Sequence, residues 1–306
     1  MLPLQWDFAQ QLKHNRDGSH STQANRARTL DLAARELREL GYNNLRAANL
    51  KQRHIKTLVE HWQKNGRTAG TIKNRMSHLR WSLEKLGKPG VAGVTNDQLG
   101  IEHRQYVAIE SKAIAVDADR LEGVRDEHLR MSLRLQAAFG LRREEALKIQ
   151  PGWADQGDRL ELKPSWTKGG RPRSIPIRLD EQRQLLREAK ALVGAGSLIP
   201  PARSYVQQLR LYERQTSEAG ISRAHGLRHL YAQTRYLELT GRQAPAVRMS
   251  MMLRVDGEAL PAIPEIPANG MHEGLSDRQA RELITEELGH SRTEITNIYL
   301  GSPRGA

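Results

Sequence analysis

The sequence predicts a mainly α-helical protein of two domains, the second of which also holds a small β-hairpin or sheet. The chain of 306 residues is long enough for two domains. Apolar residues recur every three or four positions through most of residues 3–86 and 118–239, as on the buried face of a helix. Two short stretches at 159–163 and 174–177 flank a glycine-containing turn, which is typical of a β-hairpin.

Composition and charge favour a soluble protein with a polyanionic partner. There is no run of about 18 apolar residues, and the N-terminus lacks the basic start and apolar core of a signal peptide. We therefore expect a cytoplasmic protein without membrane association. The absence of cysteine excludes disulfides, thiolate catalysis and cysteine-based metal sites. The 48 lysines and arginines exceed the 35 acidic residues, and the net charge of +13 predicts binding to a polyanion.

The first 105 residues are expected to form a bundle of about four helices. Ser21 or Thr22 is the expected N-cap of the second helix, and Gly41 and Gly87 end the second and fourth. Residues 88–117, with Pro89 and several glycines, are interpreted as a linker that could make a short contact with the next domain. The four expected helices span residues 3–18, 22–40, 48–64 and 69–86.

The polar faces of the last two helices in this bundle are strongly basic. Residues 1–105 carry 18 Lys and Arg against 9 Asp and Glu (18 − 9 = +9), whereas the rest of the chain carries 30 against 26 (30 − 26 = +4). Charge of one sign over two adjacent helices favours contacts to DNA phosphates over an ordinary solvated face. The predicted DNA-binding residues are Lys51, Arg53, Lys56, Lys64, Arg67, Lys73, Arg75 and Arg80.

The second part of the chain is expected to place helices on both sides of the hairpin. These helices span about 118–124, 126–139, 142–149, 180–193, 203–218 and 226–239. Ser276 and Gln279 form a capping-box pattern that predicts one more helix, to about Glu287. Between these last two helices, residues 241–275 contain four prolines, which argues against one long helix. We interpret this stretch as a surface insertion or a lid, with Met249, Met251 and Met252 packed.

Two basic residues lie where they could face an anion. Arg142 begins an expected helix, with Glu145 one turn later, and Lys168 lies in the glycine-containing turn of the hairpin. An arginine at a helix N-terminus is unfavourable unless an anion or an acid compensates it. The alternatives are a surface arginine paired with a glutamate, and an ordinary solvated turn.

Two further stretches each contain histidine. His225, Arg228 and His229 lie at the start of an expected helix, and positive charge there favours a bound anion over a simply capped helix. Near the C-terminus, His290 and Tyr299 lie nine positions apart. Taken alone, this last pair fits a helix end and a packed aromatic side chain.

Taken together, these residues suit phosphoryl transfer. That reaction needs a nucleophile, positive donors around the phosphate oxygens and an acid for the leaving group. A tyrosine, two arginines with two histidines, and a lysine can supply these three functions. No cluster of carboxylates indicates a metal site, so we expect neither a metal nor a cofactor.

In this order, the motifs resemble those of the tyrosine recombinase (phage integrase) family. They are Gly-Leu-Arg-x-x-Glu at 140–145, a hairpin lysine, His-x-Leu-Arg-His at 225–229, and Leu-Gly-His at 288–290 with a tyrosine nine residues after the histidine. The resemblance covers roughly residues 118–300. It places six residues at the family's catalytic positions, Arg142, Lys168, His225, Arg228, His290 and the nucleophile Tyr299, and two at supporting positions, Glu145 and His229.

The resemblance also implies an architecture. A helical core-binding domain at residues 1–105 and an α+β catalytic domain at residues 106–306 would form a C-shaped clamp around double-stranded DNA. The spacing from Arg228 to Tyr299 is long for the family, and the extra length maps to an insertion at about 241–275.

The implied activity is site-specific recombination of DNA through a 3′-phosphotyrosine intermediate, which integrates or excises a mobile element such as a prophage. Four protomers would synapse two attachment-type sites in the nucleoid, and a DNA-bending or directionality protein would be an accessory partner to look for. Two alternatives remain: a type IB topoisomerase-like enzyme, which reseals the original strand, and a catalytically idle DNA-binding protein of the same fold.

Overall fold

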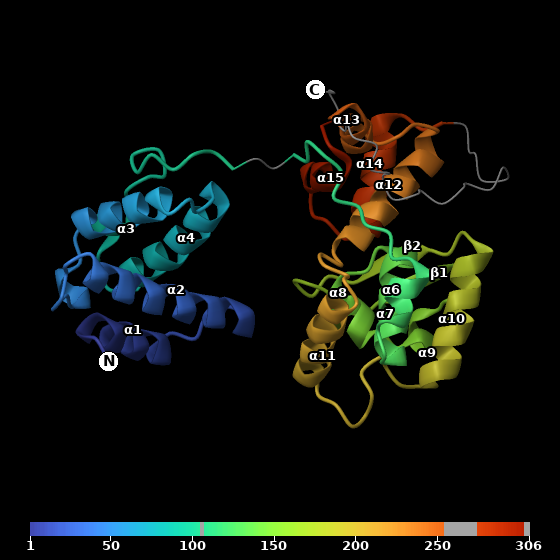
Figure 1. The fold of residues 1–306 in the computed structure, drawn as a ribbon, viewed down its shortest axis with the longest axis horizontal. Coiled ribbons are helices and arrows are strands. Elements are labelled where there is room, and N and C mark those ends of the chain that lie inside the picture. The colour runs from blue at the N-terminus through green and yellow to red at the C-terminus, as the bar shows by residue number, and fades with distance from the viewer. Residues whose placement is uncertain (105–106, 254–273, 303–306) are drawn as a thin grey trace. The chain divides into compact units, whose positions relative to one another are not determined.

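The structure is a computed structural model, which describes residues 1–104, 107–253 and 274–302. The chain divides into two compact units, Met1–Gln105 and Tyr106–Ala306 (Figure 1). The fold is mostly helical, with one two-stranded antiparallel sheet in the second unit. Among the described residues, no helix combines the length and the apolar character needed to cross a membrane.

The N-terminal unit is a helical bundle around one apolar core. Leu30, Leu37, Leu58, Trp62 and Leu79 are almost completely buried in it. The helices pack because each places apolar residues three or four positions apart on one face. Its helices are α1 (Pro3–His14), α2 (His20–Glu39), α3 (Gln52–Lys64), α4 (Ala69–Lys85) and the short α5 (Pro89–Ala92), with a 3₁₀ turn at Ala47–Asn49.

Two sequence expectations for this unit need correction. The cap of α2 is Ser19, whose hydroxyl accepts a hydrogen bond from the Thr22 backbone N–H, so neither Ser21 nor Thr22 is the cap. Residues 88–117 are not a free linker, because Leu99 and Ile101 belong to the N-terminal core. Further along, the backbone N–H of Ile114 bonds to the carbonyl of Gly226 in the second unit.

The second unit arranges its helices around α12 (Gly226–Thr240), which contacts α7 (Glu127–Phe139), α14 (Asp277–Glu287) and α15 (Thr293–Leu300). Figure 1 shows these elements in green, orange and red, although they are far apart in sequence. Ser276 caps α14 in the capping box that the sequence predicts. The other helices are α6 (Ala118–Glu122), α8 (Arg143–Lys148), α9 (Pro151–Ala154), α10 (Asp180–Val193), α11 (Tyr205–Glu218) and α13 (Pro245–Leu253).

The sheet is the predicted hairpin. Strands β1 (Arg159–Leu162) and β2 (Arg173–Pro176) pair antiparallel, with Leu160 opposite Ile175 and Leu162 opposite Arg173. Alternation along the strands buries one face of the hairpin. The connection between the strands contains a 3₁₀ turn at Pro164–Trp166.

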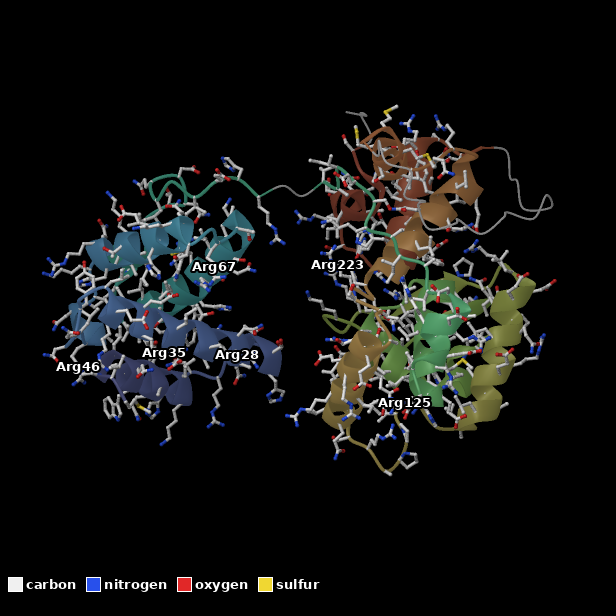
Figure 2. All side chains as sticks on the ribbon, viewed as in Figure 1. Arg28, Arg35, Arg46, Arg67, Arg125 and Arg223 are labelled. Carbon is white, nitrogen blue, oxygen red and sulfur yellow. The ribbon has the colours of Figure 1, made fainter. Side chains whose placement is uncertain are left out.

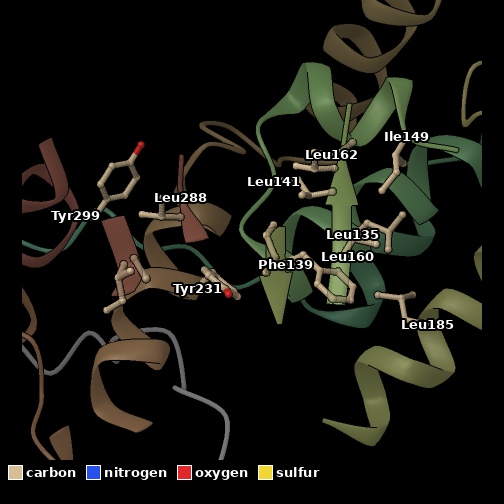
Figure 3. Close-up of a cluster of buried hydrophobic side chains, with 14 of the residues drawn as sticks. Leu135, Phe139, Leu141, Ile149, Leu160, Leu162, Leu185, Tyr231, Leu288 and Tyr299 are labelled. Atoms are coloured by element: carbon tan, nitrogen blue, oxygen red, sulfur yellow. The ribbon is translucent and has the colours of Figure 1, made fainter. Parts of the chain in front are cut away.

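The largest core of the second unit extends from the hairpin to the C-terminal helices. Figure 3 shows Tyr299 and Leu288 at one end of this cluster, with Phe139, Leu160 and Leu162 further along. Tyr299 is therefore anchored in the same core as the sheet. A smaller core under α11 contains Leu129, Leu133, Tyr212 and Leu227.

The described part of residues 241–275 begins as a packed helix. Ala246, Val247 and Ser250 of α13 are buried, and a Cβ on Gly301 would lie only 2.7 Å from the Ala246 backbone nitrogen. Small residues permit this close approach. Met251 and Met252 are 53% and 78% exposed, so the expectation that they pack is wrong. Residues 254–273 lie outside the described residues, and the insertion stays a prediction.

Gly140 links α7 to α8 in a conformation that requires glycine. Its φ is +59°, and a Cβ at this position would lie 2.5 Å from Cδ1 of Tyr231 in α12. The left-handed region disfavours residues with a side chain, and the ring leaves no room for one. Gly140 therefore sets how closely α7 approaches α12.

We predict that Gly140→Ala destabilises the second unit by about 2–5 kcal/mol, the sum of left-handed strain and overpacking. Gly220→Ala is the matched control, because Gly220 has φ +67° but nothing within 4 Å of an added Cβ, so it should lose only about 1–2 kcal/mol. Hydrogen-exchange protection of the α7 and α12 amides during denaturation measures both values. Equal losses in the two variants would contradict the steric account.

Candidate active site

Tyr299 presents its hydroxyl to two basic groups at the N-terminal end of α12. The ring is 6% exposed, and its oxygen lies 3.1 Å from Nε2 of His225 and 3.4 Å from Nε of Arg228. The His290 ring stacks on the tyrosine ring with centroids 5.2 Å apart, and the His229 ring lies at 4.5 Å. The hydroxyl thus sits among cationic or hydrogen-bonding groups, while the ring is fixed by packing.

The guanidinium of Arg228 is completely buried and is held by backbone carbonyls. Nη1 donates to the carbonyl oxygen of Gly140, and Nη2 donates to that of Leu288. Nη2 also lies 3.3 Å from Nε2 of His290. The turns at Gly140 and at Gly289, both with positive φ, place these carbonyls. The Gly-Leu-Arg and Leu-Gly-His stretches therefore supply the carbonyls that hold Arg228 in place.

Glu145 joins Arg142 to the same network. As the capping-box residue of α8, its carboxylate accepts from the Arg142 backbone N–H at 2.6 Å and from Arg142 Nη1 at 2.8 Å. Its other donor is Arg173 Nη2, at 2.7 Å. Burial raises the pKa of Glu145, but the charges of Arg173, Arg228 and Arg142 outweigh burial and hold it below its ordinary value. Glu145 is therefore a buried carboxylate anion that orients Arg142.

Arg173 is a member of the site to which the sequence analysis gave no role. It opens β2, is nearly buried, and donates through Nη1 to the carbonyl of Leu288 at 2.7 Å. Burial and then the charge of Arg228 lower the pKa of Arg173 to about 9, while Glu145 opposes the shift. The sequence signal that could have indicated its burial is its position in the strand. Alternation places residue 173 on the same face as the buried Ile175.

His290 is oriented by two threonines. Its Nδ1 lies 3.0 Å from the hydroxyl of Thr296, which lies 2.6 Å from the hydroxyl of Thr285. Burial, followed by the charge of Arg228, lowers the pKa of His290 to about 3. The imidazole is therefore neutral at pH 7, and its Nε2 faces the Arg228 guanidinium.

The two histidines at the N-terminal end of α12, the N-cap His225 and His229, differ in access. His225 is exposed to solvent, whereas the His229 ring is buried behind Tyr299, and its Nδ1 has no hydrogen-bond partner among the described residues. Burial lowers the pKa of His229 to about 3, and the neighbouring charges act in the same direction. His225 is partly desolvated where it contacts Tyr299, and this desolvation, followed by the charges of Arg228 and Arg142, also lowers its pKa. Both are neutral near pH 7.

The assembled charges define an anion site. Arg142, Arg173 and Arg228 bring three positive charges to one carboxylate, Glu145, and the nearby histidines are neutral. A buried excess of positive charge is stable when an anion compensates it. A phosphate beside the Tyr299 hydroxyl would meet that need and would be placed for nucleophilic attack.

Two family models match the chain. A phage integrase N-terminal domain matches residues 3–92, and an integrase domain matches residues 105–234, so together they cover 220 (90 + 130) of 306 residues. The chain belongs to the tyrosine recombinase (phage integrase) family. No curated protein matches this sequence.

Solved structures of DNA-bound integrases and recombinases share the fold of this chain. A lambda integrase dimer bound to a COC′ core site is 15% identical with a TM-score of 0.57, covering 98% of this chain and 77% of that one. XerH site-specific recombinase bound to palindromic difH substrate is 16% identical with a TM-score of 0.57, covering 98% and 82%. Tn1549 transposon integrase in complex with circular intermediate DNA is 14% identical with a TM-score of 0.55, covering 99% and 96%.

Lys168 is the predicted site residue that the structure does not bring to the cluster. It is exposed in the connection between β1 and β2 and makes no hydrogen bond or ion pair with the residues that the structure describes. The hairpin itself is tied to the site through Arg173, five residues later. Lys168 is thus carried on a hairpin that Arg173 holds in place, and its side chain has no partner among the described residues.

The basic residues predicted to bind DNA fall into two groups. Lys51, Arg53, Lys56, Lys64 and Arg67 are exposed, and Figure 2 labels Arg67 among the arginines of the N-terminal unit. The other group, on α4, is partly buried and consists of Lys73, Arg75 and Arg80.

Two of the partly buried residues already have protein partners. Arg75 lies over the Trp62 ring and 3.7 Å from Glu36, and Arg80 donates to the Val94 carbonyl at 2.8 Å. Arg75 and Arg80 therefore support the bundle, whatever else they contact.

We predict that His229 makes the second unit less stable as the pH falls from 6.5 to 5. Its pKa is about 3 when folded and about 6.5 when unfolded, so only the unfolded state takes up the proton in this window. The loss should approach about 1.4 kcal/mol per pH unit for this histidine. His229→Gln should flatten the slope, and the exposed His14→Gln should not. A slope unchanged by His229→Gln would overturn the assignment.

Proposed function

We propose that the protein breaks and rejoins DNA strands at specific sites, with Tyr299 as the nucleophile. The observation that carries this proposal is the contact of the Tyr299 hydroxyl with His225 and Arg228, beside Arg142 and Arg173, which share the carboxylate of Glu145. A buried tyrosine without a chemical task would not need its hydroxyl in such surroundings.

In the proposed first step, the Tyr299 oxygen attacks the phosphorus of a phosphodiester, and the bond from phosphorus to the 5′ oxygen breaks. The phenolic proton passes to Nε2 of His225, which is neutral near pH 7. Lys168 gives a proton to the departing 5′ oxygen. The products are a 3′-phosphotyrosine and a free 5′-hydroxyl.

The positive groups stabilise the charge that develops on the phosphate oxygens. Arg228 and Arg142 are held in place before the substrate arrives, by the Gly140 and Leu288 carbonyls and by Glu145. Pre-organised donors are worth more than mobile ones, because they need no reorganisation during the reaction. His290 stacks against the tyrosine ring and adds a donor or acceptor on the same side.

In the proposed second step, a 5′-hydroxyl of another strand attacks the phosphotyrosine and releases Tyr299. The phosphodiester energy is kept in the covalent intermediate, so the reaction needs no nucleotide cofactor. We propose that four protomers act on two synapsed attachment-type sites of a mobile element. The solved lambda integrase tetramer bound to a Holliday junction, which shares this fold at 16% identity, supports that arrangement.

The exposed lysines and arginines of the N-terminal unit support the proposed DNA partner. Lys56 and Lys64 of α3 and Arg67 after it extend into solvent from one helical layer. Positive side chains of this kind bind phosphates without regard to sequence and release counterions. In this proposal the N-terminal unit supplies affinity, and the second unit supplies the chemistry.

We predict that Tyr299→Phe abolishes covalent attachment to DNA while leaving binding within about twofold. The measurement uses labelled, nicked duplexes made from the DNA that flanks the gene, in EDTA, resolved on denaturing gels. Loss of the hydroxyl removes the nucleophile but leaves the packed ring in place. Covalent adducts that persist in the variant would sink the assignment. Strand exchange between two labelled duplexes separates a recombinase from an enzyme that only reseals the original strand.

We predict that Lys168→Ala slows cleavage by about 10²–10⁴-fold, the usual range for the loss of a general acid. A bridging 5′-thio substrate should restore the rate, because a thiolate leaves without protonation. Arg171→Ala, in the same exposed connection, is the matched control and should cleave both substrates like the parent protein. No rescue by the thio substrate would count against the acid role.

A further inference from the structure

A hollow of about 540 Å³ opens beside the candidate active site and is not used by the proposed chemistry. It lies between α11 and the loop that leads into α12, within the second unit. His225 belongs to both places, because it contacts Tyr299 and also lines the hollow. Two arginines, Arg143 and Arg223, line it as well.

Arg223 occupies a strained backbone conformation. Its φ is +63°, and it is the one non-glycine residue with positive φ among the residues that the structure describes. A side chain disfavours the left-handed region, so such outliers are typical of positions that perform a task. The Arg223 side chain is exposed, is labelled in Figure 2, and makes no hydrogen bond or ion pair with the described part of the chain.

The hollow and the candidate active site share two chain segments, although each also draws on others. At the start of α8, Arg142 serves the active site, and the next residue, Arg143, lines the hollow. In the loop before α12, His225 serves the active site, and Arg223 and Ser222 line the hollow. Each segment therefore offers positive or hydrogen-bonding groups both to the active site and to the hollow.

Arg143 already has a partner within the protein, but the interaction is weak. It forms an ion pair with Glu213 at 3.0 Å, and both side chains are about half exposed. Exposed pairs of this kind contribute little to stability, so an incoming anion can displace the carboxylate or share the guanidinium with it.

We infer that this hollow binds the DNA phosphate next to the scissile one on the same strand, with Arg223 and Arg143 as its ligands. This inference rests on the proposed function of the neighbouring site. Each strand of a DNA duplex carries one phosphate per about 3.4 Å of helix axis, so a strand seated at Tyr299 must place another phosphate close by. The contact would fix the position of the scissile phosphate and would make Arg223 a positioning residue.

The first test compares three full-length variants on one labelled duplex at several salt concentrations. Arg223→Gln should weaken binding about tenfold and reduce the salt slope by about 1, the effect of one lost phosphate contact. Arg125→Gln, an exposed arginine of the same unit that does not line the hollow, should change neither value. Glu213→Gln should strengthen binding, because it frees Arg143. Identical slopes for Arg223→Gln and Arg125→Gln would overturn the inference.

The second test locates the phosphate. A neutral methylphosphonate replaces one phosphate beside the scissile position in the cleavable duplex. The parent protein should lose about tenfold in the rate of adduct formation, while Arg223→Gln should lose little further, because its contact is already absent. Independent losses in substrate and variant would refute the assigned contact. Tyr299-dependent adducts formed normally by Arg223→Gln would reject this inference and leave the proposed chemistry standing.

Discussion

The buried guanidinium of Arg228 is the constraint on which the second unit depends. Burying an unpaired charge costs several kcal/mol, and this one is offset by two backbone carbonyls and by the nearby carboxylate of Glu145. The carbonyls belong to turns after α7 and α14, so one side chain of α12 fixes the ends of two other helices. Arg142 and His290 directly follow these two turns. The contacts that stabilise the buried cation therefore also fix the positions of these two site residues.

The network also explains why the site is electropositive before any substrate arrives. Arg173 and Arg228 converge on the Leu288 carbonyl, and Glu145 is shared between Arg173 and Arg142. The histidines remain neutral near pH 7 because burial lowers their pKa values, and the positive charges nearby lower them further. The site therefore offers rigid guanidinium groups together with imidazoles that can accept or donate a proton, a combination suited to a phosphate that changes its charge distribution.

Sequence reasoning reached the helices and the ordered motifs because both depend on local spacing. It placed the capping box of α14 and the hairpin, and it selected Arg142, His225, Arg228, His290 and Tyr299, which the structure brings together. It missed the role of Arg173, because a buried arginine among exposed basic residues has no local signature beyond strand alternation. It also did not predict that Arg75 would contact Trp62 and Glu36, or that Arg80 would donate to the Val94 carbonyl. Nor did it predict that α13 would pack through small residues and expose two methionines. These outcomes are set by tertiary contacts.

The most direct measurement of the central claim is the identity of the atom that joins protein to DNA. A covalent complex formed on nicked flanking DNA would be digested with a protease and a nuclease, and the modified peptide would be sequenced by mass spectrometry. The account predicts a single 3′-phosphonucleotide on the oxygen of Tyr299, formed in EDTA. A nucleotide attached to any other residue, or through its 5′ phosphate, would contradict it.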